Sequence, residues 1–187
     1  MASQSRPRHH YRYDEYLVTA RDSAIKLEFA DGEIHALAGG SKRHNALALR
    51  VGAALHAGLG PGCIAFQSDQ RVRIPVANKA VYPDVTVVCG AIETDALDPE
   101  TIVNPTLVVE VLSPSTEEYD RGENWLAYQT VQSLKEFVLV SQESMRVERY
   151  RRLESGSWEY LEATTGAIDL VTGARLELEE LYRGLPD

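Results

Sequence analysis

The segment from Leu107 to Thr116 constrains the fold more than any other part of this sequence. Its first six residues, Leu-Val-Val-Glu-Val-Leu, are apolar except for Glu110. An unbroken Val/Leu run is typical of a strand buried on both faces, and Pro114 cannot donate to a sheet, so we expect the strand to end before it. A carboxylate inside such a strand is costly unless it is paired, hydrogen-bonded or bound to a cation. Glu110 therefore requires a partner.

Asp84 is the best candidate for a second acid near Glu110. It is the only acid of another strand-like run, Tyr82-Pro-Asp-Val-Thr-Val-Val-Cys89, and lies near the start of that run, directly after Pro83. If the two strands pair, both carboxylates converge at one edge of the sheet, where two hard oxygen donors make a site for a divalent cation. Singly, each acid is more often a cap or an ion-pair partner; together, their mutual repulsion favours a bound Mg²⁺ or Mn²⁺.

The remaining periodic segments predict a mixed α/β fold. Apolar residues at helical spacing predict helices, and alternating apolar and polar residues predict strands. In the first half of the chain we expect a helix over 13–20, a hairpin at the Asp31-Gly32 turn, a helix over 41–58, a long strand over 63–74 with a polar break at 67–70, and a strand within 82–89. In the second half we expect a strand at 107–112, a helix from Ser115 or Thr116 to about 131, a strand at 136–141, a hairpin of 146–153 and 158–163, and a short helix within 176–182. This order predicts a mixed β-sheet flanked by helices, with an N-terminal β-hairpin.

Length and composition bound the domain organisation and the compartment. The chain has 187 residues, enough to bury a full core, so we expect residues 11–187 to form a single domain and the polar residues 1–10 to form a disordered tail. The sequence shows no apolar run long enough to cross a bilayer and no signal peptide, which predicts a cytoplasmic protein that does not engage a membrane. Cys63 and Cys89 are too few for a disulfide framework or a zinc site, so we expect reduced thiols.

Charge limits the partners of this chain. The formal net charge is −9, which works against non-specific attraction to a polyanion. A nucleic-acid partner would therefore need a local basic patch or metal ions that offset the acids, with weak and salt-dependent binding. The basic stripe of Arg146, Arg149, Arg151 and Arg152 is split between two strand faces, and ion pairs with nearby Glu residues explain it equally well.

Two further residues carry open alternatives. Glu28 lies on the polar side of the predicted hairpin and could join the two acids, although a solvent-facing acid is nearly as good an explanation. His44 follows Lys42 and Arg43 near the start of a predicted helix. A helix N-terminus favours a phosphate, but a solvated histidine is the more common reason for such a residue.

At this point the chain shows a resemblance to a known family. Pro83-Asp84, the Leu107 to Thr116 string, and Tyr119-Asp-Arg-Gly122 with its following helix resemble the large prokaryotic family of putative restriction endonucleases with a PD-(D/E)XK nuclease-like domain. The similarity covers most of residues 12–165. The resemblance implies a restriction-endonuclease-like α/β core that cleaves phosphodiester bonds in DNA with Mg²⁺ or Mn²⁺, and by analogy a homodimer.

The resemblance also implies roles for individual residues. Asp84 and Glu110 would hold the metal ion, the Val111 carbonyl would add another oxygen, and Glu28 would act as an auxiliary acid. A lysine normally completes the site, but the position two residues after Glu110 is Leu112. Members of this family often place the lysine on the following helix, where this chain has Asn124, which we expect at an exposed position.

Because the usual lysine is missing, the sequence leaves three hypotheses for the function. The first hypothesis is a metal-dependent DNA endonuclease-like protein, with Asp84, Glu110, Asn124 and Glu28 as catalytic residues and with cleavage weakened by the lost lysine. Arg121 and Lys42 are the cations considered as substitutes. The alternative is a catalytically silent nuclease-fold protein that acts as a binding or assembly module. A hydrolase of a smaller phosphoester is a third possibility, favoured by the acidic charge.

Overall fold

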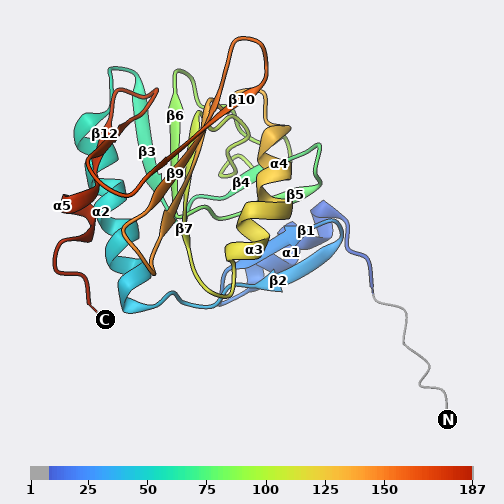
Figure 1. The fold of residues 1–187 in the computed structure, drawn as a ribbon. Coiled ribbons are helices and arrows are strands. Elements are labelled where there is room, and N and C mark those ends of the chain that lie inside the picture. Colours follow the sequence, from blue (N-terminus) through green and yellow to red (C-terminus); the bar gives the residue numbers. More distant parts are fainter. Residues whose placement is uncertain (1–8, 187) are drawn as a thin grey trace.

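The centre of the protein is a six-stranded mixed sheet (Figure 1), in a computed structural model that describes residues 9–186. Its strand order is β10-β9-β8-β7-β6-β3, with β7 and β8 parallel and the other neighbours antiparallel. The strands are β3 (Cys63–Gln67), β6 (Val85–Cys89), β7 (Leu107–Leu112), β8 (Glu136–Ser141), β9 (Val147–Arg152) and β10 (Trp158–Ala163). The predicted central strand is thus β7, and all six of its residues are buried.

The two faces of β7 contribute to two different apolar cores. Leu107, Val109 and Val111 pack in the core beneath α2 (Lys42–Gly58) and α5 (Leu178–Tyr182). Val108 and Leu112 point the other way, into the core beneath α4 (Trp125–Gln129). Glu110 shares this second face because side chains alternate along a strand. The carboxylate therefore lies in the layer between the central sheet and α4.

A second sheet of four short strands joins this layer. Its order is β2-β1-β5-β4, with β1 (Leu27–Ala30), β2 (Glu33–Ala36), β4 (Val72–Ile74) and β5 (Lys79–Val81). Phe29 and Ala80 on one face pack against α1 (Tyr13–Asp22) through Tyr16. On the other face, Val72, Ile74 and Val81 join the core that contains α4. Residues on β1 and β5 can therefore approach Glu110 from the side.

Two predicted elements differ from the structure, and one hairpin was not predicted. The strand predicted over 63–74 is two strands in different sheets, because the polar residues after Gln67 form a turn, with the Gln70 amide donating to the Gln67 carbonyl at 3.0 Å. The helix predicted after Thr116 is divided into α3 (Glu117–Tyr119), a π-helical turn η1 (Asp120–Asn124) and α4. A hairpin of β11 (Ala167–Asp169) and β12 (Arg175–Glu177) precedes α5 and was not predicted.

The prediction of reduced cysteines is wrong. Cys63 and Cys89 lie directly opposite each other in the antiparallel pair of β3 and β6, and they form a disulfide. The two residues are 26 positions apart in the sequence, and only the register of the two strands brings them together.

The structure bears only in part on the predictions about the tail, the domain and the membrane. Residues 1–8 of the expected disordered tail lie outside the described residues, and the single domain over 11–187 stays a prediction. Among residues 9–186, no helix has the length and apolar character needed to span a membrane.

The aromatic cluster around Phe137 gives the first test of the fold. Phe137 is 0% exposed, and its ring centroid lies 5.2 Å from that of Trp125 and 5.1 Å from that of Tyr128. Because truncation leaves a cavity that the neighbouring rings cannot fill, Phe137→Ala should lower the free energy of unfolding by about 3–5 kcal/mol in urea denaturation. Leu126→Ala, at a residue of α4 that is 64% exposed, should change it by less than about 0.5 kcal/mol. Equal losses in the two variants would contradict this packing.

Candidate active site

The pairing of β6 with β7 brings Asp84 and Glu110 together. Val85 lies opposite Val109, so the residues just before β6 and late in β7 are neighbours. The Asp84 amide donates to Glu110 Oε2 at 3.3 Å, and the Val111 amide donates to Asp84 Oδ2 at 2.7 Å. Beyond the last backbone pair of β6 and β7, each carboxylate accepts a hydrogen bond from a backbone amide next to the other acid.

Glu110 is the most strongly perturbed acid of this site. Its side chain is buried, with the residue 9% exposed, and its Oε1 atom accepts hydrogen bonds from Asn124 Nδ2 at 3.3 Å and from the Tyr128 hydroxyl at 3.4 Å. Burial raises the pKa of Glu110 well above its usual value, and the charges of Asp120 and Asp84 raise it further. The site therefore has a surplus of negative charge in a position shielded from water.

The π-helical turn η1 adds two residues to the site. Asp120 and Asn124 stand four residues apart, and the Asn124 Nδ2 atom donates to Asp120 Oδ1 at 3.1 Å as well as to Glu110. Asn124 is 3% exposed, so the prediction of an exposed position is wrong: the turn folds inward over the central sheet. Single π-helical turns often occur at functional sites. Asn124 Oδ1 is buried and has no hydrogen-bond partner among residues 9–186.

Glu28 approaches the same cluster from the second sheet. Its Oε1 atom accepts a hydrogen bond from the Tyr82 amide at 2.8 Å, two residues before Asp84. Burial raises the pKa of Glu28, and the charge of Asp120 adds to that effect. The hairpin therefore carries this carboxylate toward the acids rather than toward solvent.

His44 also belongs to the cluster. Its Nε2 atom lies 3.0 Å from Asp84 Oδ1, and its amide donates to the Ser41 hydroxyl that caps α2. The hydrogen bond to Asp84 raises the pKa of His44 against the opposing effect of burial, and the Val111 backbone carbonyl also raises it. The structure thus gives His44 a carboxylate partner instead of a solvated position. The imidazole sits beside Asp84 and Val111, two of the three predicted metal ligands.

The donor chemistry of this cluster fits a hard divalent cation. Among residues 9–186, no group of three or more His, Cys, Asp or Glu side chains is arranged as a metal-binding set. Mg²⁺ seldom uses such a cage; proteins hold it through one or two carboxylates together with water and substrate phosphates. Asp84 and Glu110 are two such carboxylates, and the unpartnered Oδ1 atom of Asn124 is a neutral oxygen donor beside them. The surplus of negative charge around Glu110 is what a cation would relieve.

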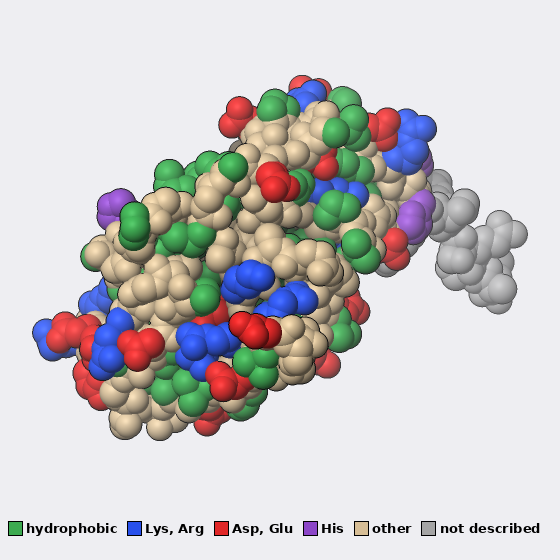
Figure 2. Space-filling view, turned by 90° about the horizontal axis from the view of Figure 1, so that it is seen from above, with side chains coloured by type: hydrophobic (Ala, Val, Ile, Leu, Met, Phe, Trp, Pro, Cys, Tyr) green, Lys and Arg blue, Asp and Glu red, His purple; other side chains and the backbone are tan. Residues whose placement is uncertain are grey.

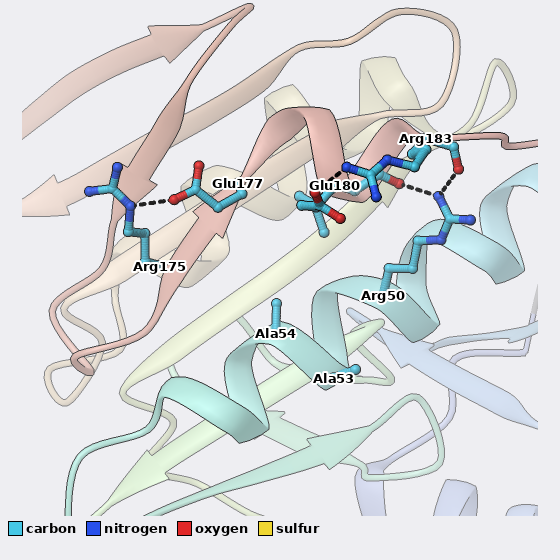
Figure 3. A pocket seen from close by; sticks show the side chains of 8 residues that line it. Arg50, Ala53, Ala54, Arg175, Glu177, Glu180 and Arg183 are labelled. Carbon is cyan, nitrogen blue, oxygen red and sulfur yellow. Dashed lines mark hydrogen bonds and ion pairs between the residues drawn. The ribbon is translucent and has the colours of Figure 1, made fainter.

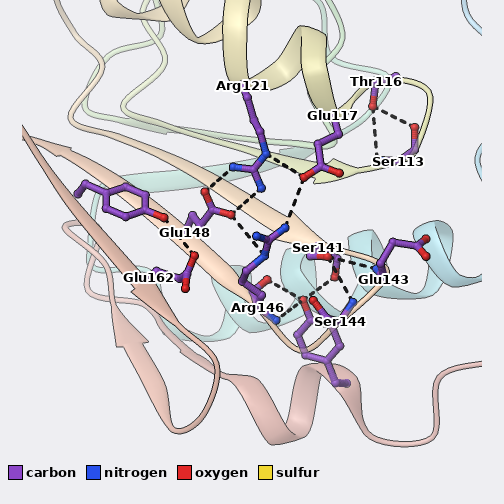
Figure 4. A network of polar contacts seen from close by, with 12 residues as sticks. Ser113, Thr116, Glu117, Arg121, Ser141, Glu143, Ser144, Arg146, Glu148 and Glu162 are labelled. Carbon is purple, nitrogen blue, oxygen red and sulfur yellow. Dashed lines mark hydrogen bonds and ion pairs between the residues drawn. The ribbon is translucent and has the colours of Figure 1, made fainter.

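The cations predicted as substitutes for the missing lysine are placed elsewhere. Arg121 donates to both oxygens of Glu148, at 2.5 and 2.7 Å, and to Glu117 at 2.8 Å (Figure 4). Arg146 joins the same polar network through Glu117. Lys42 is exposed at the first residue of α2. Leu112, at the usual lysine position, is buried in the apolar core.

Sequence reasoning missed Lys79 and Asp120. Lys79 is 7% exposed, and its ammonium donates to the Tyr119 hydroxyl at 3.0 Å. No sequence pattern marks it, because it follows a loop and its neighbourhood depends on the pairing of β5. Asp120 could have been found as the first acid of the Asp120-Arg-Gly string after the central strand.

The arginine stripe on β9 serves structure. Arg151 donates to Glu136 at 2.5 Å, Arg149 donates to Glu159 at 2.7 Å, and Arg152 donates to the backbone carbonyls of Leu134, Gln129 and Val131. On the face shown in Figure 2, basic and acidic side chains are interspersed. The ion-pair explanation of the stripe is confirmed for Arg146, Arg149 and Arg151.

A cavity of about 500 Å³ lies between α2, β12 and α5 (Figure 3), and it shares no lining residue with the acid cluster. Its guanidinium groups already have partners. Arg50 donates to the carbonyls of Leu181 and Arg183, and Arg175 donates to Glu177. The chemistry of the protein is therefore concentrated at the acids, not in this cavity.

Comparisons with known proteins agree with this arrangement. A family model described as "Uma2: Putative restriction endonuclease" matches residues 13–185. Two proteins of Synechocystis sp. (strain ATCC 27184 / PCC 6803 / Kazusa) are similar in sequence. "Uncharacterized protein slr1290" is 34% identical over 175 residues, covering 92% of this chain and 91% of that protein. "Uncharacterized protein sll1609" is 32% identical over 145 residues, covering 77% of this chain and 82% of that protein.

A solved structure shows the same fold. It is described as a putative nuclease belonging to DUF820 from Anabaena variabilis ATCC 29413, and it matches with a TM-score of 0.74, covering 94% of this chain and 99% of that chain. The sequence identity is 17%, so this likeness bears on the fold alone. The predicted restriction-endonuclease-like mixed sheet flanked by helices is confirmed.

The raised pKa of Glu110 predicts how stability depends on pH. A carboxyl whose pKa is higher in the folded state binds more protons there, so its contribution to the free energy of unfolding is lost as pH rises through the raised value. His44, whose pKa is also raised, acts in the same direction. In EDTA, the wild type should lose stability from about pH 5 to about pH 8 by at least about 1 kcal/mol more than Glu110→Gln.

Urea denaturation at several pH values measures this difference. Glu118→Gln, at an exposed acid of α3, is the matched control and should follow the wild type. If Glu110→Gln shows the same pH dependence of unfolding free energy as Glu118→Gln, the pKa of Glu110 is not raised in the folded protein.

Proposed function

We propose, on the premise that the chain belongs to the Uma2 family of putative restriction endonucleases, that it hydrolyses phosphodiester bonds in DNA with a divalent metal ion held by Asp84 and Glu110. The family model spans residues 13–185, so the family predicted from the sequence is confirmed. The observation that carries the proposal is the pair of carboxylates on neighbouring strands, joined by the 3.3 Å hydrogen bond from the Asp84 amide to Glu110. Mg²⁺ or Mn²⁺ is the ion that this oxygen-rich set suits.

The residues of the chain have distinct roles in this proposal. Asp84 and Glu110 hold the ion, with the Val111 carbonyl as a further oxygen. When bound, the ion supplies positive charge to the scissile phosphate and to the attacking water. Asn124 positions water through its unpartnered Oδ1 atom, and Glu28 acts as an auxiliary acid. His44 orients Asp84 through the 3.0 Å contact to Oδ1.

The reaction is a hydrolysis, so its balance is simple. The oxygen of a water molecule forms a bond to phosphorus, and one bridging bond from phosphorus to a sugar oxygen breaks. One proton of the water goes to the leaving oxygen and the other is released to solvent. Glu28, whose pKa burial raises and which is not a proposed ligand, is suited to accept the proton released by the attacking water before it passes to solvent.

DNA is the proposed substrate and partner, and a homodimer that addresses both strands is proposed by analogy. With a net charge of −9, the chain should bind duplex DNA weakly, more strongly with a divalent ion, and less strongly as salt increases.

A catalytically silent member of the same family is the rival. The observation that favours it is the residue at each usual lysine position: Leu112 is buried in the apolar core, and Asn124 carries no charge. Such a protein would keep the acids and bind metal or DNA without cleaving.

Metal binding gives a test that does not depend on cleavage. At about a hundred times its dissociation constant, a bound ion should stabilise the wild type by roughly 2.7 kcal/mol. Asp84→Asn keeps an acceptor for the Val111 amide but loses the charge, so most of this stabilisation should disappear. Thermal melts with Mn²⁺ and with EDTA measure it, with Asp95→Asn as a control outside the cluster. An equal response of the wild type and Asp84→Asn to Mn²⁺ would exclude this site.

Cleavage itself is tested by nicking of supercoiled plasmid. The wild type should nick with Mg²⁺ or Mn²⁺ and not with EDTA, and Glu110→Gln should lower the rate by on the order of a hundredfold or more, because it removes charge that holds the ion. A wild type that binds Mn²⁺ and DNA but does not nick would support the silent rival instead.

A further inference from the structure

Lys79 is a buried ammonium whose charge is opposed by burial, while the charges of Glu123, Glu28 and Asp120 act on it without a direct ion pair among residues 9–186. It is 7% exposed, and its single hydrogen bond goes to the neutral hydroxyl of Tyr119 at 3.0 Å. An ammonium has three donors, and burying it without partners is costly. The structure therefore leaves two donors of Lys79 for a group that is not part of the chain.

The strand register directs Lys79 toward the acid cluster. Ala30 on β1 lies opposite Lys79 on β5, so Glu28, two residues before Ala30, is a diagonal neighbour on the same face. This face also carries Val81 and Ile74, which pack in the core beneath α4. Lys79 and Glu110 thus project into the same layer from two different sheets.

Tyr119 ties Lys79 to the edge of the site. The ammonium lies 4.5 Å from the centroid of the Tyr119 ring, in addition to its bond to the hydroxyl. Tyr119 directly precedes Asp120, the first residue of η1. Burial raises the pKa of Tyr119, and the charges of Glu28 and Glu110 raise it further.

The other cations near this layer are already committed. Arg73 lies on β4 opposite Ala80, so its side chain is on the other face of this sheet. It donates to the Lys79 carbonyl at 2.8 Å and to Asn78 at 3.0 Å, and its guanidinium lies 4.1 Å from the Tyr13 ring centroid. Arg121 is held by Glu148 and Glu117. Lys79 is therefore the cation with donors to spare on the face of the acids.

We propose that Lys79 contacts the scissile phosphate and supplies, from β5, the positive charge that is absent at Leu112 and Asn124. This inference rests on the proposed function, since it assigns a residue to the same reaction. The two free donors of the ammonium hold a non-bridging phosphate oxygen while water attacks phosphorus. Negative charge that develops on this oxygen is then met by a preorganised donor in a buried site.

The test compares Lys79→Met, which keeps the length of the side chain and removes the charge, with Lys79→Arg, which keeps the charge. Lys135→Met, at an exposed lysine that precedes β8, makes the same chemical change outside the site. Lys42→Met tests the rival cation. Three readouts are measured for each protein: plasmid nicking with Mn²⁺, stabilisation by Mn²⁺ in thermal melts, and duplex DNA affinity against salt with Ca²⁺ in place of Mg²⁺.

The expected result separates Lys79 from a structural residue. Lys79→Met should nick on the order of a hundredfold more slowly, Lys79→Arg should recover part of the rate, and Lys135→Met should match the wild type. Lys79→Met should keep its Mn²⁺ stabilisation. The slope of log affinity against log salt should become shallower by about 0.9, as expected for one lost phosphate contact. A side chain that only packs would not change this slope.

Other outcomes overturn the inference. If the wild type nicks and Lys79→Met nicks equally fast with an unchanged salt slope, Lys79 has no role in the reaction while the proposed function stands. If Lys42→Met alone loses activity, the cation comes from α2. A Lys79→Met variant that loses Mn²⁺ stabilisation would show that Lys79 supports the fold of the site and not the phosphate. A wild type that neither nicks nor binds DNA overturns the proposed function and this inference with it.

Discussion

A carboxylate on a fully buried strand of the central sheet is the constraint on which this site depends. Glu110 is largely removed from solvent, and the chain surrounds it with donors: the Asp84 amide just before β6, Asn124 of η1 and Tyr128 of α4. These donors do not neutralise it, because Asp84 and Asp120 bring further negative charge. The fold thus keeps mutually repelling carboxylates close together, and a bound cation and the proposed phosphate-binding ammonium of Lys79 would reduce this repulsion.

The cluster of acids lies between the two sheets. The central sheet supplies Asp84 and Glu110, the π-helical turn supplies Asp120 and Asn124 from above, and the four-stranded sheet carries Glu28 from the side. The strand that carries Glu110 is anchored by apolar residues on either side of the acid, such as Val108 and Leu112. Rigid elements on three sides keep like charges close together, which loops would allow to separate.

Two other buried acids, Glu136 and Glu148, are paired with arginines. Glu148 receives two hydrogen bonds from Arg121, and Glu136, which is fully buried, receives one from Arg151. Their charges are compensated within the chain, and burial is tolerated because the partners are present. Glu110 differs from these two acids because no arginine pairs with it among residues 9–186.

Much of this arrangement is determined by the sequence alone. The Val/Leu run with one acid determines that β7 is central and that Glu110 needs a partner, and Pro83-Asp84 identifies the neighbouring strand, because these patterns are local. Three features depend on contacts between distant residues, so only the tertiary structure decides them: the inward turn that buries Asn124, the strand register that joins Cys63 to Cys89, and the placement of Lys79 beside the acids. Local spacing fixes which strand and which face a residue occupies, whereas the pairing of separate strands decides what that residue meets.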